Sequence, residues 1–262
     1  MRAKKSLGQH FLNDPSIIAE IIDALKPLPE EKVLEIGPGR GALTVPLLNT
    51  GAQVTAVELD RVLAPEMAAE LERFGNFKIF EADILRFDPA ALGLKRFAVV
   101  GNLPYNITTP VMDWLFKYND RISRAILMMQ KEVAERVISP PGRKSRSTLS
   151  VLTELYFDSR MVIKVPPESF DPPPQVHSAV VLLTHHGHDF GIKGAERFRK
   201  FVRNCFAAKR KSLLNNLNSA YPLPRQVLEK IINDNLEKAG IRAEQLSLQD
   251  FIKLSQKIFE IL

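Results

Sequence analysis

The chain has 262 residues, a hydrophobic content of 45%, as in ordinary globular proteins, and a formal net charge of +6 at pH 7. This length suffices for one large core and a smaller second domain. No apolar stretch approaches the ~18 residues of a membrane helix, and the first residues lack the apolar segment of a secretory signal. The single cysteine, Cys205, cannot form an intramolecular disulfide. We therefore expect a cytoplasmic protein with no membrane contact.

Apolar runs alternate with helical patterns through the first half of the chain. Strands are expected at 32–36, 53–57, 77–81, 97–101 and 124–129. Helices are expected at 15–26, 41–49, 61–73, 108–118 and 130–138. This order is typical of an α/β fold with a mostly parallel, doubly wound sheet.

The first expected strand leads into a glycine-rich turn that contains Gly37, Gly39 and Gly41. Glycine lets the backbone approach a ligand closely. The G-x-G-x-G spacing differs from the G-x-G-x-x-G of dinucleotide binders, and alone it also fits an ordinary strand-to-helix turn. Glu58 ends the next strand, 21 residues after Gly37. This is close to the ~20-residue offset at which an acidic side chain binds ribose hydroxyls, so the pair indicates a nucleoside site.

Two further strands end in polar residues. Asp83 could bind an adenine amino group or could cap the segment that follows it. Asn102-Leu103-Pro104-Tyr105 follows the next apolar run. The Asn102 side chain and the Pro104 carbonyl can accept hydrogens from an amino group, and Tyr105 offers a flat face to a purine. Ligands of open α/β sheets bind at the carboxyl ends of the strands, so we expect these residues to share a crevice with Gly37 and Glu58.

A loop from Val165 to Pro174 has five prolines in ten residues and Phe170 in its middle. The prolines stiffen the loop and should keep Phe170 out of any strand. Phe170 then either anchors the loop in the core or forms a stacking wall opposite Tyr105 for an unstacked base.

Beyond a linker at 185–194, helices are expected at 195–208, 210–219, 225–239 and 247–260. Residues 1–188 carry 22 basic and 22 acidic side chains, whereas residues 189–262 carry 14 and 8. On the first of these helices Phe198, Phe201, Val202 and Cys205 form an apolar stripe, which leaves the basic residues on its other faces. Such clustering is typical of a surface that binds a phosphate backbone, although a solvated helix face has the same pattern.

The candidate RNA-binding residues are basic side chains of this region and of an earlier loop rich in Gly, Pro and Ser. They are Arg143, Lys144, Arg146, Arg203, Lys209, Arg210 and Lys211. The loop could contact RNA or could be only a mobile basic loop. His185, His186 and His188 lack an accompanying Cys or carboxylate pattern, so no metal is expected.

Together these motifs resemble the bacterial small-subunit ribosomal RNA adenine dimethyltransferases, the kasugamycin-sensitivity family. The resemblance covers almost the whole chain and rests on residues 9–14, 35–44, 58–60, 83, 102–106, 127–133 and 170–181. It implies a Rossmann-like class I methyltransferase domain at 1–186, completed by antiparallel strands at 161–165 and 178–183. A smaller all-helical, RNA-binding domain would occupy 187–262.

Members of that family transfer methyl groups from S-adenosyl-L-methionine to two adjacent adenosines near the 3′ end of small-subunit ribosomal RNA. The resemblance implies that S-adenosyl-L-methionine is the cofactor and that the assembling small ribosomal subunit is the partner. It implies cofactor contacts from His10, Leu12, Gly37, Gly39, Glu58, Leu59, Asp83, Ile84 and Asn102. It implies a catalytic group of Asn102, Pro104, Tyr105 and Phe170. His10 departs from the Asn of some members, although both side chains can form hydrogen bonds.

Three other functions fit part of the sequence. A dimethyltransferase of large-subunit RNA would share the chemistry. A nicotinamide-dependent oxidoreductase would share the sheet, but the glycine spacing and the Asn102 motif argue against it. A non-catalytic ribosome-assembly factor would need only the basic surface. Nothing suggests an obligate dimer, so we expect a monomer.

Overall fold

The computed structural model describes residues 9–236 and 240–262. The chain forms two compact units. Unit 1 extends to Ala134 and includes Phe157–His185, and unit 2 consists of Glu135–Tyr156 and His186–Leu262. Residues 135–156, which we expected within the methyltransferase domain, thus belong to the helical unit. The last part of the helix expected at 225–239 lies outside the described residues.

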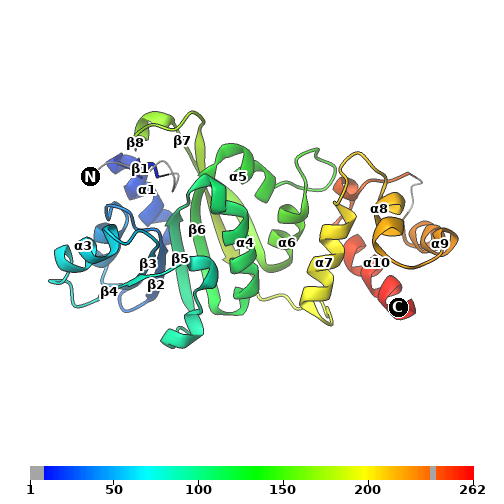
Figure 1. Cartoon of the computed structure of the whole chain (residues 1–262), viewed down its shortest axis with the longest axis horizontal. Helices are drawn as coiled ribbons and strands as arrows, with labels where there is room; N and C mark the ends of the chain where they lie inside the picture. Colours follow the sequence, from blue (N-terminus) through cyan, green and yellow to red (C-terminus); the bar gives the residue numbers. More distant parts are fainter. Residues whose placement is uncertain (1–8, 237–239) are drawn as a thin grey trace. The chain divides into compact units, whose positions relative to one another are not determined.

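Within the described residues, unit 1 is built on a seven-stranded sheet with the order β4-β3-β2-β5-β6-β9-β7 (Figure 1). The strands are β2 (Lys32–Ile36), β3 (Gln53–Glu58), β4 (Phe77–Glu81), β5 (Phe97–Asn102), β6 (Ile122–Gln130), β7 (Phe157–Val165) and β9 (Ser178–His185). The first five strands in this order are parallel. β9 is antiparallel to both β6 and β7. The predicted doubly wound sheet with an antiparallel pair is therefore confirmed.

Four helices accompany these strands: α1 (Pro15–Leu25), α2 (Thr44–Asn49), α3 (Leu63–Glu70) and α4 (Thr108–Lys117). Val33, Ala98 and Ile126 lie in one core with apolar side chains of α1, α2 and α3. The alternate strand residues, such as Val99 and Leu127, are buried as well. Burial on both faces explains why these strands read as continuous apolar runs in the sequence.

The order of the strands reverses between β2 and β5. From β2 the chain moves outward through β3 and β4, and it then returns to add β5 on the other side of β2. The carboxyl ends of these parallel strands lie at the same edge of the sheet. In open α/β sheets, ligands bind in the crevice at such a reversal point.

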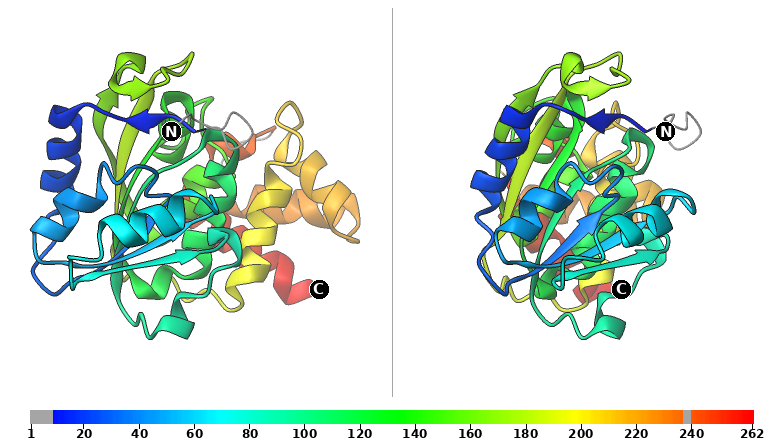
Figure 2. Two further views of the ribbon diagram at one scale, coloured as in Figure 1. Left: turned by 60° about the vertical axis from the view of Figure 1, so that its left-hand side comes forward. Right: turned by 90° about the vertical axis from the view of Figure 1, so that its left-hand side faces the viewer.

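A second small sheet joins the N-terminal segment to the proline-rich loop. β1 (Phe11–Leu12) pairs antiparallel with β8 (Phe170–Asp171), and Leu12 lies opposite Phe170. In Figure 2 the dark blue strand β1 lies beside the yellow-green segment that carries β8. The prediction that Phe170 is outside any strand was wrong. The prolines flank the two paired residues and so do not remove their N–H groups.

Unit 2 is helical in its described part. Its helices are the end of α5 (Lys131–Val137), α6 (Thr148–Tyr156), α7 (Ala195–Cys205), α8 (Leu213–Ala220), α9 (Arg225–Asn235) and α10 (Leu248–Ile261). The predicted apolar stripe of α7 is confirmed, because Phe198, Phe201, Val202 and Cys205 are all buried. Among the described residues, none of the helices has the length and apolar character needed to cross a membrane.

Candidate active site

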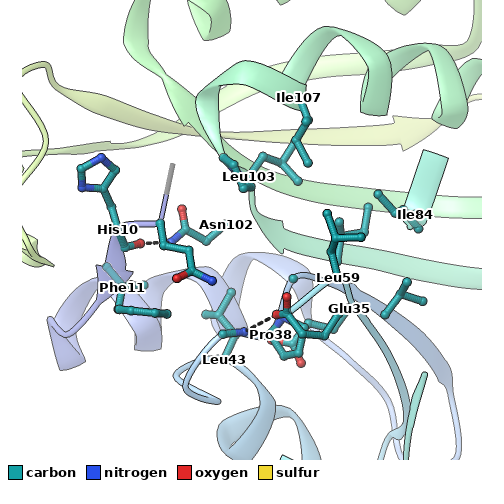
Figure 3. A pocket seen from close by; sticks show the side chains of 18 of the residues that line it. His10, Phe11, Glu35, Pro38, Leu43, Leu59, Ile84, Asn102, Leu103 and Ile107 are labelled. Atoms are coloured by element: carbon teal, nitrogen blue, oxygen red, sulfur yellow. Dashed lines mark hydrogen bonds between the residues drawn. The ribbon is translucent and has the colours of Figure 1, made fainter. Parts of the chain in front are cut away.

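A pocket in unit 1 lies at the carboxyl ends of β2, β3, β4 and β5 (Figure 3). Its walls come from the N-terminal segment, the glycine-rich turn, the two strand ends after β3 and β4, the 102–107 turn and Phe170. All the residues that the sequence assigned to cofactor binding and to catalysis line this pocket. The structure thus brings together residues from six separate segments, while their individual roles remain predictions.

The glycine-rich turn needs glycine for two different reasons. Gly37 and Gly39 have φ angles of 63° and 58°, which other residues rarely adopt. A Cβ at Gly39 would lie 3.1 Å from the Phe11 ring, whereas a Cβ at Gly37 would meet no atom within 4 Å. Gly39 therefore permits the close approach of the N-terminal segment. At Gly37 the space is open, so glycine is needed there only for its positive φ angle.

Glu58 is oriented by backbone donors. Its Oε2 accepts a hydrogen bond from the Gly39 N–H at 3.2 Å, and its Oε1 accepts one from the Asp60 N–H at 2.9 Å. Burial raises the pKa of the Glu58 carboxyl, although the N–H groups of Asp60 and Gly39 oppose this shift. Each carboxylate oxygen retains a lone pair, so the side chain can accept two hydroxyl groups of a ligand.

Asp83 caps the segment that follows it, which is one of the two roles considered from the sequence. Its Oδ1 accepts a hydrogen bond from the Leu85 N–H at 2.9 Å, at the start of the 3₁₀ helix Ile84–Arg86. The Oδ2 atom lies 4.0 Å from the Arg86 Nε, in a pair too exposed to be strong. The cap uses one oxygen and fixes the side chain at the pocket wall, so capping does not exclude binding of an amino group.

The amide of Asn102 has a defined orientation. Its Nδ2 donates a hydrogen bond to the backbone oxygen of His10 at 2.9 Å, which Figure 3 marks with a dashed line. A backbone oxygen can only accept, so the nitrogen must face it. The Oδ1 atom is consequently the part of the amide that can accept a hydrogen from a ligand.

The Pro104 carbonyl is engaged by its own turn. It accepts hydrogen bonds from the Ile107 N–H at 3.1 Å and from the Thr108 hydroxyl at 3.4 Å. A carbonyl oxygen has two lone pairs, and both meet donors of the chain here. A substrate amino group would share this oxygen with the two donors, so acceptance of a substrate hydrogen by Pro104 stays a prediction.

The ring that stacks on Tyr105 is that of His10. The two ring centroids are 5.8 Å apart with an interplanar angle of 25°. The His10 Nδ1 lies 2.8 Å from the Pro172 oxygen, and the Tyr105 hydroxyl lies 2.8 Å from the Ser178 Oγ. Phe170 lines the pocket but is 4% exposed and packs in the core, as the anchoring alternative predicted. Because Phe170 also lines the pocket, its stacking on a base stays a prediction.

Sequence reasoning overlooked Glu35, which also lines the pocket. Its side chain is 1% exposed, and its Oε2 has no hydrogen-bond partner among the described residues. Burial raises the pKa of Glu35 to about 8, and the charge of Glu58 adds to the shift. The available signal was an acidic residue in the middle of the apolar strand 32–36.

The N-terminal segment is fixed by contacts that no local pattern predicts. The Arg40 guanidinium bonds to Asp171 at 3.1 Å and lies 4.2 Å above the centroid of the Phe11 ring. The Gln9 side chain donates a hydrogen bond to Asp60 at 3.3 Å. This segment therefore joins the glycine-rich turn, the end of β3 and the proline-rich loop around the pocket.

The predicted RNA-binding residues of unit 2 divide into two groups. Arg143, Lys144, Lys209, Arg210 and Lys211 are exposed, and the Arg203 side chain is 41% exposed beside Glu196. Arg146 is instead 2% exposed. Its guanidinium donates hydrogen bonds to the Ser139 and Leu246 oxygens and to Glu154. The inclusion of Arg146 was wrong, because these bonds hold it inside the unit.

The sequence matches the ribosomal RNA adenine dimethylase family over residues 1–258. The chain belongs to this family. The dimethylase is accordingly an rRNA adenine methyltransferase, and the resemblance drawn from its motifs is confirmed.

Relatives of the dimethylase match over almost its full length. It is 40% identical to ribosomal RNA small subunit methyltransferase A of Thermosynechococcus vestitus, and the match covers 100% of this chain and 98% of the relative. It is 38% identical to the protein of the same name in Francisella tularensis subsp. novicida, with 97% of each chain covered.

Two solved structures share the fold of the dimethylase. The dimethyladenosine transferase of Plasmodium falciparum superposes with a TM-score of 0.80 at 28% identity, over 96% of this chain and 98% of that one. The 23S rRNA methyltransferase ErmE superposes with a TM-score of 0.73 at 30% identity, over 95% and 99%. These similarities confirm the class I methyltransferase fold predicted from the sequence.

Proposed function

We propose that this dimethylase binds S-adenosyl-L-methionine in the pocket of unit 1 and dimethylates two adjacent adenosines near the 3′ end of small-subunit ribosomal RNA. Its partner is the assembling small subunit, which it meets late in assembly through basic residues of unit 2. The observation that carries the proposal is the Asn102 amide, oriented by His10 in the same pocket as Glu58 and Asp83. Action as a monomer in the cytoplasm remains a prediction.

The residues present fit the cofactor. Glu58 can accept the ribose hydroxyls, Asp83 Oδ2 can accept the adenine amino group, and Leu59 and Ile84 offer apolar surface to the ring. The buried Glu35 Oε2 has no hydrogen-bond partner within residues 9–236 and 240–262, which favours a cationic ligand, and the cofactor carries a sulfonium and an ammonium group. When bound, S-adenosyl-L-methionine supplies an electrophilic methyl group.

Asn102 prepares the target nitrogen. An adenine amino group is a poor nucleophile because its lone pair is delocalised into the ring. A hydrogen bond from this group to Asn102 Oδ1 would draw the nitrogen towards tetrahedral geometry and free the lone pair. The amide is already oriented by His10, so little reorganisation accompanies this step. The methylated nitrogen is acidic enough to lose its proton to water, so the site needs no strong general base.

Tyr105 holds the target base by stacking. Its ring is partly exposed, and its hydroxyl is fixed by Ser178 at 2.8 Å. Enzymes that modify a base take it out of its stack, and an aromatic face compensates for part of the lost stacking. The fixed ring of Tyr105 can serve as this face.

Small-subunit RNA is the favoured substrate because the relatives with 40% and 38% identity carry the small-subunit name. A second candidate is large-subunit RNA, since the 23S rRNA methyltransferase is 30% identical over nearly the whole chain. Methyl transfer to each purified RNA distinguishes the two substrates.

Replacement of Asn102 tests the proposed mechanism. We expect Asn102→Ala to lower the rate of single-turnover methyl transfer by about 100-fold or more, because a preorganised hydrogen bond at the reacting group is lost. Cofactor affinity, measured by calorimetry, should change much less. Asn49→Ala, at an exposed position of the same unit outside the pocket, is the matched control and should leave both unchanged. Equal losses in rate and cofactor affinity would contradict the role of Asn102.

A further inference from the structure

The turn between α7 and α8 carries the most concentrated positive charge of unit 2. Lys209, Arg210 and Lys211 are consecutive and exposed. The side chain of Asn216, from the second turn of α8, is 4% exposed and bonds to the backbone of this turn. The charged residues thus project from a backbone that a buried amide supports.

Asn216 forms hydrogen bonds through both ends of its amide. Its Nδ2 donates hydrogen bonds to the Cys205 oxygen at 2.8 Å and to the Ala208 oxygen at 3.2 Å. Its Oδ1 accepts one from the Ala208 N–H at 3.2 Å. Carbonyls at the end of a helix lack partners within it, and Asn216 supplies one at the end of α7. One side chain therefore ties the last residue of α7 to the middle of the turn.

Backbone hydrogen bonds close the turn on its other side. The Lys211 N–H donates to the Ala208 oxygen at 3.0 Å, and the Leu213 N–H donates to the Ile241 oxygen at 2.9 Å. The three basic residues consequently start from defined backbone positions before any partner binds. Pre-ordering of a loop lowers the entropic cost of binding to a partner whose own shape is fixed.

We propose that Asn216 is a positioning residue for RNA recognition. It holds the 206–212 turn so that Lys209, Arg210 and Lys211 meet the phosphates of a folded RNA in one arrangement. The inference rests on the proposed RNA-binding role of this turn. It separates the effect of the turn's charge from the effect of the fixed positions of its charged side chains. Charge attracts any RNA, whereas a fixed arrangement of charges favours an RNA with matching phosphate positions.

The test is a substitution that changes no charge. Full-length Asn216→Ala is titrated with a folded transcript of small-subunit ribosomal RNA and with single-stranded polyuridylate, over a range of salt concentrations. We expect at least about a tenfold loss of affinity for the folded transcript, because the turn must now be ordered on binding. Affinity for polyuridylate and its salt dependence should not change, because counterion release depends on the number of cations.

Two further variants separate the possible outcomes. Asn218→Ala, the same change at an exposed position of α8, is the matched control and should behave like the parent chain. A variant with Lys209→Gln and Arg210→Gln should lose affinity for both RNAs, with a salt slope that falls by about one for each phosphate that the protein no longer neutralises. If Asn216→Ala does not fold, Asn216→Ser provides the same comparison, because a hydroxyl cannot reach both carbonyls.

An unchanged affinity of Asn216→Ala for the folded transcript would overturn the inference, while the charge variant could still support RNA binding by the turn. Equal losses with both RNAs would also overturn it, because they would indicate a general effect on folding. Failure of the charge variant to weaken either RNA would instead contradict the RNA-binding role of the turn itself.

Discussion

At the scale of single residues, the pocket contains two buried acidic side chains in different settings. Glu58 accepts hydrogen bonds from two backbone N–H groups, whereas Glu35 Oε2 has no hydrogen-bond partner among the described residues. A buried charge without partners is costly, and a carboxyl group can avoid this cost by holding its proton. Glu35 should therefore make the stability of the chain without its cofactor depend on pH.

The sign of this dependence follows from the pKa of Glu35, which rises from 4.5 to about 8 on folding. Below about pH 4.5 the carboxyl is protonated in both states. Between pH 4.5 and about pH 8 the unfolded chain releases the proton and the folded chain retains it, so the stability of the folded state falls as the pH rises. Glu35→Gln, which carries no ionisable group, should melt several degrees higher than the parent chain at pH 8.5 and close to it at pH 5.

Thermal melting of the cofactor-free chain checks this prediction. Glu72→Gln, at an exposed position, controls for the change in net charge and should follow the parent chain at both pH values. If Glu35→Gln and the parent chain lose stability equally between pH 5 and pH 8.5, Glu35 does not hold its proton in the folded state.

The gathering of strand-end residues around one pocket could be predicted, because the carboxyl ends of parallel strands lie at the same edge of the sheet. This reasoning identified Gly37, Glu58, Asp83 and Asn102. It could not identify the hydrogen bond from the Asn102 amide to the His10 oxygen, or the burial of Arg146. Their partners lie far along the sequence: Asn102 is 92 residues from His10, and Leu246 is 100 residues from Arg146. Only the tertiary structure decides whether a basic residue of a loop faces water or a carbonyl.

At the scale of elements, periodicity predicted the parallel strands and α7 but overlooked α6 and the β1–β8 pair. Residues 149–153 of α6 are all buried, so the helix lacks the polar face that reveals an amphipathic period. Its threonine and serine residues also have low helix propensity. The β1–β8 pair has two residues in each strand, too few for any alternation to be read.

One ion pair fixes an element that supports the pocket. Arg124 of β6 forms a two-pronged ion pair with Glu31, with both distances 2.7 Å, and bonds to the Leu25 and Lys26 oxygens at the end of α1. These side chains are about four-fifths buried, at 21% and 19% exposure. The contact joins α1 to the sheet on the face where the large core lies.

We expect Arg124→Ala to lower the free energy of unfolding by about 2–3 kcal/mol, because it leaves a partly buried carboxylate and two carbonyls without their donor. Denaturant titration measures this change. Arg61→Ala breaks an exposed pair with Glu81 at 3.5 Å and should cost less than about 1 kcal/mol. Equal effects of the two substitutions would show that the Arg124 contact contributes little beyond a surface pair.

At the scale of the whole molecule, the two units are interleaved in sequence. The chain leaves unit 1 after Ala134, returns at Phe157 and leaves again after His185. The sequence predicted a basic, helical second unit, but with a single boundary near residue 186 between the two units. The segment 135–156 joins unit 2 through contacts such as the Arg146 bond to the Leu246 oxygen, which no local pattern reveals.

The central claim is that one pocket brings a methyl donor to an adenine held by Asn102 and that the adenine belongs to small-subunit ribosomal RNA. Its most direct test is to incubate the full chain and S-adenosyl-L-methionine with small and large subunits from cells that lack this enzyme, and then to map modified nucleotides in both RNAs. We predict dimethyladenosine at two adjacent positions near the 3′ end of the small-subunit RNA, no change in the large-subunit RNA, and loss of the signal with Asn102→Ala. Dimethylation of the large-subunit RNA instead, or an undiminished signal with Asn102→Ala, would contradict this account.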